Sequence, residues 1–387
     1  MAEQPLFSPI HKDNSTKLFS MQAFLQTPLR LKNLFLDLGA TYTWFDCSNY
    51  TSSTYQNIHY DTTVCLQLDT LISGNCFEPP SPTCFNDSCE CFPENSVTRQ
   101  VDIGDILLDT LALPKTDGKN PGKLALIPEF EFSCAKPKLL AGLPAGVNGL
   151  AALGRFNFSF PAQISKAFSS PFVFAICAPS TPSANGVAVF NSFGPYFFLP
   201  GIDVSKLLTY TPLLLKPFGD TVIGYNRPSD EYFVGVTGIR VNGKPIPINQ
   251  TLLGINQTTG LGGTKISTST PYTMLQTSIF KTFTAAFKAA ANALHLKRKG
   301  FGGVAAGRAS LRSDKRKRGM SVTEAANLAK KAPCYAADSA PMHGDVVTVY
   351  YLGSEGCKKL LEDDMEAWLQ ENTKGSRRRF EVIGPGW

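Results

Sequence analysis

The stretch LFLDLGATYTWFDC, at residues 34–47, contains an apolar run, an acid, a glycine and then a second β-forming run. Asp37 ends the apolar run, and Gly39 follows two residues later. A glycine at this point allows the chain to turn tightly behind the acid because it has no Cβ. The β-branched and aromatic residues that follow are typical of a strand. The stretch therefore predicts two strands joined by a turn that carries a carboxylate.

The sequence on both sides of this stretch also favours β structure. Residues 19–27 alternate between apolar and polar, residues 101–113 predict a strand pair, and Asn242-Gly243 predicts a tight hairpin turn. The 32 Gly and 27 Pro residues indicate many turns. Helices are predicted at residues 159–168 and at residues 271–290, where Leu275, Ile279, Phe283 and Phe287 recur every four positions. The chain is therefore predicted to be mainly β.

Several blocks, in matching order, resemble a known group of plant proteins. They are LFLDLGATYTWFDC (34–47), GVNGLAALGR (146–155), FGPYFFLPG (193–201), YTPLLLKP (210–217), YFVGVTGIRVNGK (232–244) and GGTKISTSTPYTMLQTSIFKTFTAAF (262–287). The group comprises the basic 7S globulins, the extracellular dermal glycoproteins and the xylanase-inhibitor-like proteins of the pepsin-like aspartic peptidase superfamily. The resemblance covers about residues 8–290, roughly three quarters of the chain.

The resemblance implies a pepsin-like, two-lobed acid-protease barrel fold. We expect a cysteine-rich N-terminal lobe of the xylanase-inhibitor type at residues 1–190 and a partial C-terminal lobe at residues 191–290. The matching blocks stop near residue 290, so the second lobe is predicted to be incomplete, and a truncated gene product is an open alternative. Residues 291–387 are predicted to form a basic, low-complexity and largely disordered tail.

Aspartic peptidases need two opposed carboxylates that share one proton, so that one acts as a base towards water while the other acts as an acid. Their usual motif is Asp-Thr/Ser-Gly, once per lobe. Here the first copy is Asp37-Leu38-Gly39, and Ser267-Thr268-Ser269 stands where the second is expected. A serine hydroxyl does not ionise near neutral pH, so Ser267 cannot replace the second acid. We therefore expect no intact catalytic residues, only the remnant positions Asp37 and Ser267.

The cysteines gather in the first half of the chain and predict a disulfide framework. A zinc site is the alternative. One residue lies between Cys89 and Cys91, however, whereas zinc-ligand pairs usually have two to four intervening residues. Eight cysteines allow on the order of 100 pairings, so the sequence leaves the pairing open. The disulfide candidates are Cys47, Cys65, Cys76, Cys84, Cys89, Cys91, Cys134 and Cys177.

Six glycosylation sequons point to the same oxidising, extracellular setting. The candidate asparagines are Asn14, Asn49, Asn86, Asn157, Asn249 and Asn256. The first residues do not resemble a signal peptide, since they lack an apolar run. The resemblance nevertheless implies the apoplast or cell wall, and the start of the chain favours a missing leader or a cytosolic protein with free thiols. No 18-residue apolar stretch is present, so we expect no membrane span.

The net charge of +6 lies entirely in residues 291–387, which hold 17 basic and 11 acidic residues. Two basic clusters, at residues 297–299 and 315–318, could serve as a nuclear-localisation or nucleic-acid patch. No aromatic stacking platform accompanies them, which favours a solvated linker instead. Nucleic acid is therefore not an expected partner.

The function that these observations predict is binding without catalysis. The family includes inhibitors of microbial glycoside hydrolases such as xylanases and endoglucanases, and we expect such enzymes, or peptide ligands, as partners. No cofactor and no metal are expected. Two alternatives stay open: an aspartic endopeptidase, if a second carboxylate exists, and a seed-storage-like or truncated product without a defined activity.

Overall fold

The computed structural model describes residues 5–294, apart from residues 69–71, 77–80, 83, 119, 199–200, 220 and 224–226. Beyond residue 294 it describes the backbone of three strands, β20 (Val349–Gly353), β21 (Gly356–Leu360) and β22 (Phe380–Glu381). Most of the predicted basic tail, including both basic clusters, lies outside the described residues. The tail and its disorder therefore stay predictions.

The chain divides into two compact units. The first comprises residues 1–235 together with 254–271, and the second comprises residues 236–253 together with 272–387. The predicted boundaries near residues 190 and 290 follow the resemblance instead and stay predictions. The two remnant positions, Asp37 and Ser267, both belong to the first unit.

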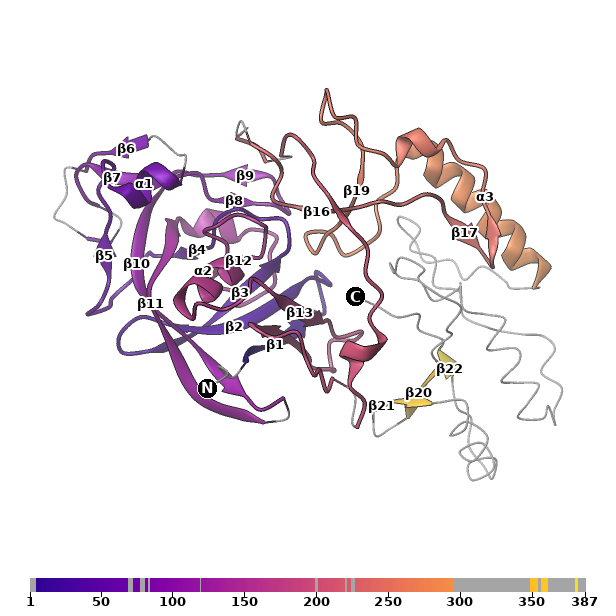
Figure 1. The fold of residues 1–387 in the computed structure, drawn as a ribbon, viewed down its shortest axis with the longest axis horizontal. Coiled ribbons are helices and arrows are strands. Elements are labelled where there is room, and N and C mark those ends of the chain that lie inside the picture. The colour runs from indigo at the N-terminus through magenta and orange to yellow at the C-terminus, as the bar shows by residue number, and fades with distance from the viewer. Residues whose placement is uncertain are drawn as a thin grey trace. The chain divides into compact units, whose positions relative to one another are not determined.

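A large sheet forms the body of the first unit (Figure 1), in the order β13-β14-β1-β2-β3-β12-β4-β11-β10-β7-β6. The strand β10 also pairs with β1, β2 and β5, so part of the sheet closes on itself. The strands are β1 (Leu6–Lys12), β2 (Phe19–Leu25), β3 (Arg30–Asp37), β4 (Trp44–Asp46), β5 (Gln56–Asn57), β6 (Ile72–Gly74), β7 (Ser88–Cys91), β10 (Gly104–Thr116), β11 (Pro121–Ala135), β12 (Gly149–Ala152), β13 (Phe174–Cys177) and β14 (Gly186–Phe190).

The stretch at residues 34–47 lies in the middle of this sheet. Its apolar run is the end of β3 and pairs in parallel with β12, with Leu34 opposite Gly149 and Asp37 opposite Ala152. A Cβ at Gly149 would overlap the carbonyl oxygen of Trp44, so only glycine lets β12 pass β4 at this point. Phe35 and Trp44 are fully buried, and side chains of this kind contribute about 1.5–3 kcal/mol each when buried.

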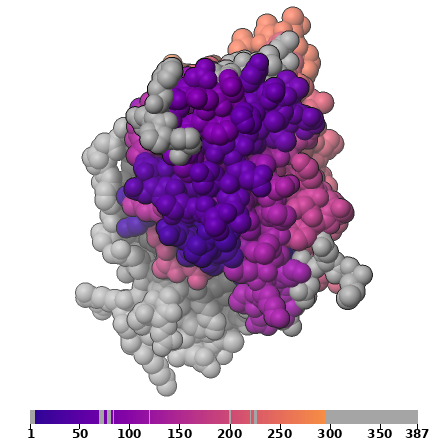
Figure 2. All heavy atoms as spheres, turned by 90° about the vertical axis from the view of Figure 1, so that its left-hand side faces the viewer, coloured from indigo at the N-terminus to yellow at the C-terminus, as the bar shows by residue number. Residues whose placement is uncertain are grey.

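The first unit also contains smaller elements around the sheet. The short strands β8 (Glu94–Asn95) and β9 (Gln100–Val101) pair with each other, and β15 (Leu213–Leu214), β16 (Tyr232–Val234) and β19 (Thr264–Ile266) form a separate sheet. The helices are α1 (Thr63–Gln67) and α2 (Phe160–Ala167), with 3-10 turns η1 (Pro137–Leu140) and η2 (Val204–Leu207). Figure 2 shows the side of this unit that carries β5, β6, β7 and α1, where early residues form most of the visible surface.

The second unit contains the helix predicted at residues 271–290, but with different ends. The helix α3 is Thr277–Ala293, so Leu275 precedes it and only part of the predicted four-residue pattern is helical. The start is set by Gln276, whose side chain accepts hydrogen bonds from the backbone N–H groups of Ser278 and Ile279.

The hairpin predicted at Asn242-Gly243 is also confirmed in the second unit. The strands β17 (Arg240–Val241) and β18 (Lys244–Pro245) flank the turn, and both turn residues have positive φ. The 3-10 turn η3 (Gln250–Leu252) follows.

Candidate remnant active site

Asp37 is the last residue of β3 and is 2% exposed. The turn predicted behind it is present, because the Gly39 backbone N–H donates to Asp37 Oδ1 at 2.8 Å. The hydroxyl of Ser96, between β8 and β9, donates to Asp37 Oδ2. Two donors from different parts of the chain thus occupy both carboxyl oxygens.

Burial raises the pKa of Asp37 above its usual value. Hydrogen bonds from Ser96 and Gly39 and the positive charge of Lys265 act in the opposite direction but do not cancel the effect of burial. The buried acid is therefore harder to ionise than an exposed aspartate.

The segment predicted to stand in place of the second motif lies against this turn. Ser267 follows β19 and is exposed, and its hydroxyl lies 2.9 Å from the hydroxyl of Ser269. Thr268 Oγ1 accepts a hydrogen bond from the Leu38 backbone N–H at 3.0 Å. Leu38 has no hydroxyl group of its own, but the Thr268 hydroxyl joins the two segments through this hydrogen bond. This role of Thr268 was not predicted from the sequence, in which its place between two serines was the available signal.

Other carboxyl groups line the same site, but each has its own partner. Glu231 lies over Gly39 and forms an ion pair with Lys265. Asp230 accepts hydrogen bonds from Arg227 Nη1 at 2.6 Å and from Thr41 Oγ1 at 2.7 Å. Among the described residues, no carboxyl group is a hydrogen-bonding partner of Asp37.

The hairpin of β8 and β9 contributes one more paired acid. Glu94 forms an ion pair with Arg99 at 2.6 Å, and its other oxygen accepts from the Val222 backbone N–H at 2.9 Å. Burial raises the pKa of Glu94, with the Val222 hydrogen bond and Arg99 opposing the shift. These contacts attach the hairpin to the loop that contains Val222.

The space left above Asp37 is small, with a volume of about 80 Å³. Pockets that bind small ligands usually measure about 300–1,000 Å³. Side chains of the protein itself, mostly paired with one another, therefore take up the site. The remaining cavity can hold water or a very small group, but it has no room for a peptide.

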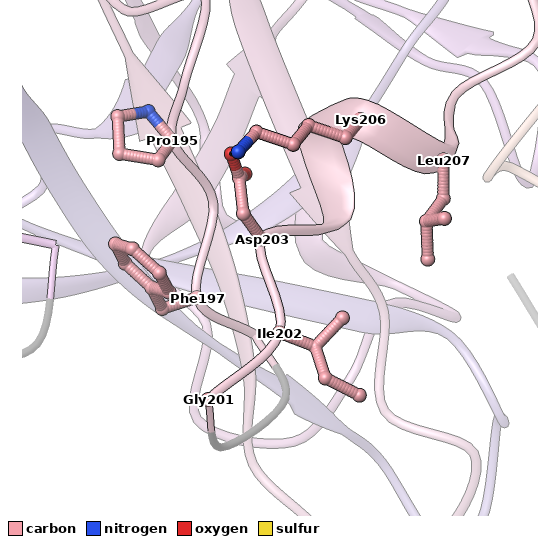
Figure 3. A pocket seen from close by; sticks show the side chains of 7 residues that line it. All are labelled: Pro195, Phe197, Gly201, Ile202, Asp203, Lys206 and Leu207. Carbon is pink, nitrogen blue, oxygen red and sulfur yellow. The ribbon is translucent and has the colours of Figure 1, made fainter.

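A more open hollow of about 720 Å³ lies elsewhere in the first unit (Figure 3). Its carboxylate, Asp203, accepts hydrogen bonds from the Ser205 and Tyr196 backbone N–H groups and caps η2. Such a capping role is structural. The lining residues are Pro195, Phe197, Gly201, Ile202, Asp203, Lys206 and Leu207.

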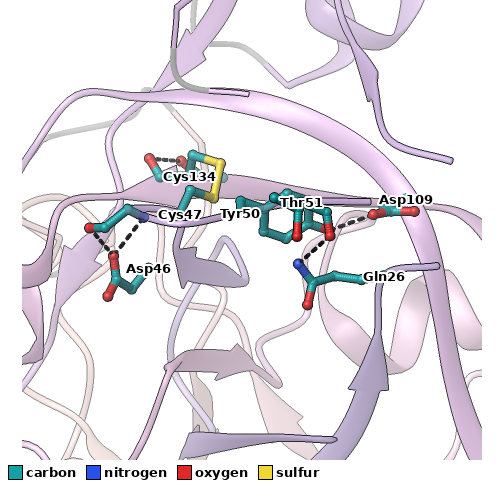
Figure 4. The surroundings of a disulfide bond; sticks show 9 residues. Gln26, Asp46, Cys47, Tyr50, Thr51, Asp109 and Cys134 are labelled. Atoms are coloured by element: carbon teal, nitrogen blue, oxygen red, sulfur yellow. Dashed lines mark hydrogen bonds between the residues drawn. A yellow bond between two sulfur atoms is a disulfide. The ribbon is translucent and has the colours of Figure 1, made fainter. Parts of the chain in front are cut away.

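Three disulfides form among the eight candidate cysteines. The pairs are Cys47–Cys134, Cys65–Cys89 and Cys76–Cys84. Figure 4 shows the first of them, which joins the residue after β4 to β11. Cys91 and Cys177 have free thiols in the structure and so differ from the prediction, and Cys91 is fully buried. Within the described residues no group of His, Cys, Asp and Glu side chains is arranged to hold a metal ion.

The six candidate glycosylation asparagines are all exposed. Exposure is compatible with a glycan at each of them, and glycosylation at these positions stays a prediction. In the described part of the chain, no helix is both long and apolar enough to cross a membrane.

Comparison with known proteins identifies relatives over most of the chain. Residues 19–192 match the model of the xylanase inhibitor N-terminal domain, and residues 231–323 match that of the xylanase inhibitor C-terminal domain. A similar curated protein is "Probable aspartic proteinase GIP2" of Nicotiana benthamiana, 41% identical over 73% of this chain and 65% of that protein. The chain thus spans about two thirds of the length of such relatives.

Solved structures match the fold as well. The crystal structure of edgp has a TM-score of 0.75 and 41% identity, covering 79% of this chain and 74% of that one. The crystal structure of basic 7S globulin from soybean has a TM-score of 0.61 and 29% identity, covering 78% and 76%. The mainly β, pepsin-like fold predicted from the sequence is confirmed by these matches.

Proposed function

The chain belongs to the xylanase-inhibitor family of pepsin-like plant proteins, and we propose that it is a non-catalytic, extracellular binding protein that inhibits a microbial cell-wall glycoside hydrolase. The observation that carries the non-catalytic part is the single acid of the remnant site. Asp37 is bonded to Ser96 and Gly39, whereas Ser267 stands where the second acid would be.

This arrangement supports the proposed absence of peptide hydrolysis. An aspartic peptidase needs one ionised and one protonated carboxyl group that face the same water. Asp37 can offer one carboxyl group, and the acids around it are engaged by Lys265, Arg227 and Arg99. Loss of general acid–base help alone costs about 10²–10⁴-fold in rate.

Glycoside hydrolases are proposed as partners because both inhibitor-type domain models match this chain. The three disulfides support an oxidising, extracellular setting, since such bonds persist mainly outside the cytosol. Xylanases and endoglucanases are the first enzymes to test.

The competing function is an aspartic endopeptidase. Two relatives favour it by name, "Probable aspartic proteinase GIP2" at 41% identity and "Probable aspartic proteinase GIP1" of Glycine max at 45%. It would require another carboxyl group to move within reach of Asp37.

Inhibition assays against a panel of fungal xylanases and endoglucanases test the proposal. We expect the folded protein to lower the initial rate of at least one of them and to be retained on that enzyme when it is immobilised. The control is the same protein after reduction and alkylation of its disulfides, which we expect to be inactive. If the protein neither binds nor inhibits any enzyme of the panel, the proposed partner class is contradicted.

A further inference from the structure

A buried acid outside the remnant site, Glu131, belongs to the strand β11 and lies next to the helix α2. We propose that Glu131 is a buried proton-binding group whose protonation contributes stability to the fold in an acidic medium that is lost at neutral pH. This inference does not depend on the proposed partner or on the remnant site.

The position of Glu131 is fixed by a neighbouring glutamine. The Glu131 backbone N–H donates to Gln163 Oε1 at 2.7 Å, and Gln163 Nε2 donates to the Glu131 carbonyl oxygen at 2.9 Å. Gln163 Nε2 also donates to the Phe158 carbonyl oxygen at 2.9 Å, just before α2 begins. The backbone of β11 is therefore tied to α2 whatever the charge of the Glu131 side chain, and the carboxyl group stays under the helix.

The carboxyl group itself has little compensation for its burial. Glu131 is 8% exposed. The Nζ atom of Lys166, on α2, lies 3.8 Å from Glu131 Oε1, beyond ordinary hydrogen-bond length, and the Lys166 side chain is 76% exposed. A buried carboxylate with a distant, solvated cation recovers only part of its lost hydration.

The other groups around Glu131 do not favour its charge. On β10 the residue opposite is Leu108, which is apolar, and on β11 itself Glu129 is a like charge. The residue after Leu108 on β10 is the acid Asp109, which accepts hydrogen bonds from the Tyr50 and Thr54 hydroxyls. On β4, which pairs with the end of β11, Asp46 is bonded to Ser48.

Burial accordingly raises the pKa of Glu131 to about 7, with Lys166 opposing the shift and Glu129 adding to it. In the unfolded chain the same group ionises near 4.5. Between these two values the folded state holds a proton that the unfolded state has lost, so raising the pH favours unfolding. The stabilisation is complete below about pH 4.5 and is lost as the pH rises through about 7.

Urea unfolding across this pH range tests the contribution of Glu131 in three proteins. The parent chain, Glu131→Gln and Glu129→Gln are compared, since glutamine imitates the protonated acid and Glu129 is an exposed neighbour on the same strand. In the parent chain we expect the folding equilibrium constant to decrease on the order of 100-fold between about pH 4.5 and 7.5. Glu131→Gln should lack this decrease. Glu129→Gln should keep most of that decrease.

Parallel pH profiles for the parent and Glu131→Gln would overturn the proposal. If Glu131→Gln does not fold, the carboxyl carbon of Glu131 can be titrated by NMR in the unmodified protein. A midpoint near 7 supports the proposal, and a midpoint near 4.5 contradicts it.

Discussion

The hydroxyl of Ser96 donates to Asp37 Oδ2 from a hairpin that is 59 residues away in the sequence. In the folded chain this donor replaces part of the water that Asp37 loses on burial, and it lowers a pKa that burial raises. The contact therefore stabilises a buried acid that, on the proposed function, no longer takes part in catalysis. Asp37 serves the fold by holding the Gly39 turn and the hairpin of β8 and β9 together.

Replacing Ser96 with alanine should destabilise the protein by about 1–3 kcal/mol near neutral pH, because a buried acid loses a hydrogen-bond donor. Urea or thermal unfolding measures this change. The matched control is Ser48→Ala, since Ser48 also donates to an aspartate, Asp46, but does so at the exposed surface. That control should change stability by less than about 0.5 kcal/mol. Equal effects of the two substitutions would mean that the Ser96 contact does not stabilise the buried acid.

The strands and disulfides explain how the remnant site is held in place. The strand β3 delivers Asp37, β12 pairs with it in parallel, and β4 leads away to Cys47. The disulfide Cys47–Cys134 closes a loop of 87 residues and lies within the main apolar core, whereas Cys76–Cys84 closes a loop of 8. A cross-link that closes a longer loop removes more entropy from the unfolded chain.

Removing these two disulfides separately should therefore have unequal effects. The double substitution Cys47→Ser with Cys134→Ser should cost about 2 kcal/mol more than Cys76→Ser with Cys84→Ser, by the chain-entropy estimate. Denaturant unfolding of both variants at one pH gives the comparison. A larger loss from the short loop would show that native packing, and not loop closure, decides the contribution of these bonds.

Sequence patterns predicted the elements better than their ends. Asn242-Gly243 predicted its hairpin because the turn depends on those two residues alone. Residues 101–113 were expected to form a strand pair, but most of them belong to the single strand β10. Gly104 lies in this strand, and a glycine is needed there because a Cβ would overlap the carbonyl oxygen of Cys134. A local pattern cannot distinguish a glycine at a turn from a glycine under a neighbouring strand.

The candidate site was predictable only in part, for the same reason. Asp37 and Gly39 were identified from one short motif, and Ser267 from a second short motif that the family resemblance placed opposite the first. The contacts of Asp37 with Ser96 and of Leu38 with Thr268 join segments 59 and 230 residues apart, and no local pattern reports them. The pairing of the cysteines required the three-dimensional fold for the same reason.

The molecule as a whole combines the scaffold of its family with a remnant site filled by its own side chains. Residues 19–192 and 231–323 match the two domains of xylanase inhibitors, and the structure superposes on that of edgp with a TM-score of 0.75. The cavity above Asp37, at about 80 Å³, is too small for a peptide. We therefore expect binding to other proteins to use surfaces outside this cavity.

Hydrolysis of denatured haemoglobin at acidic pH, with and without pepstatin, tests the proposed absence of catalysis most directly. Acidic conditions favour the proton-sharing state of two opposed acids, so any working dyad should be active there. We predict no pepstatin-sensitive release of peptides, and the same background for the parent chain and for Asp37→Asn. Cleavage that pepstatin blocks and Asp37→Asn abolishes would contradict the account.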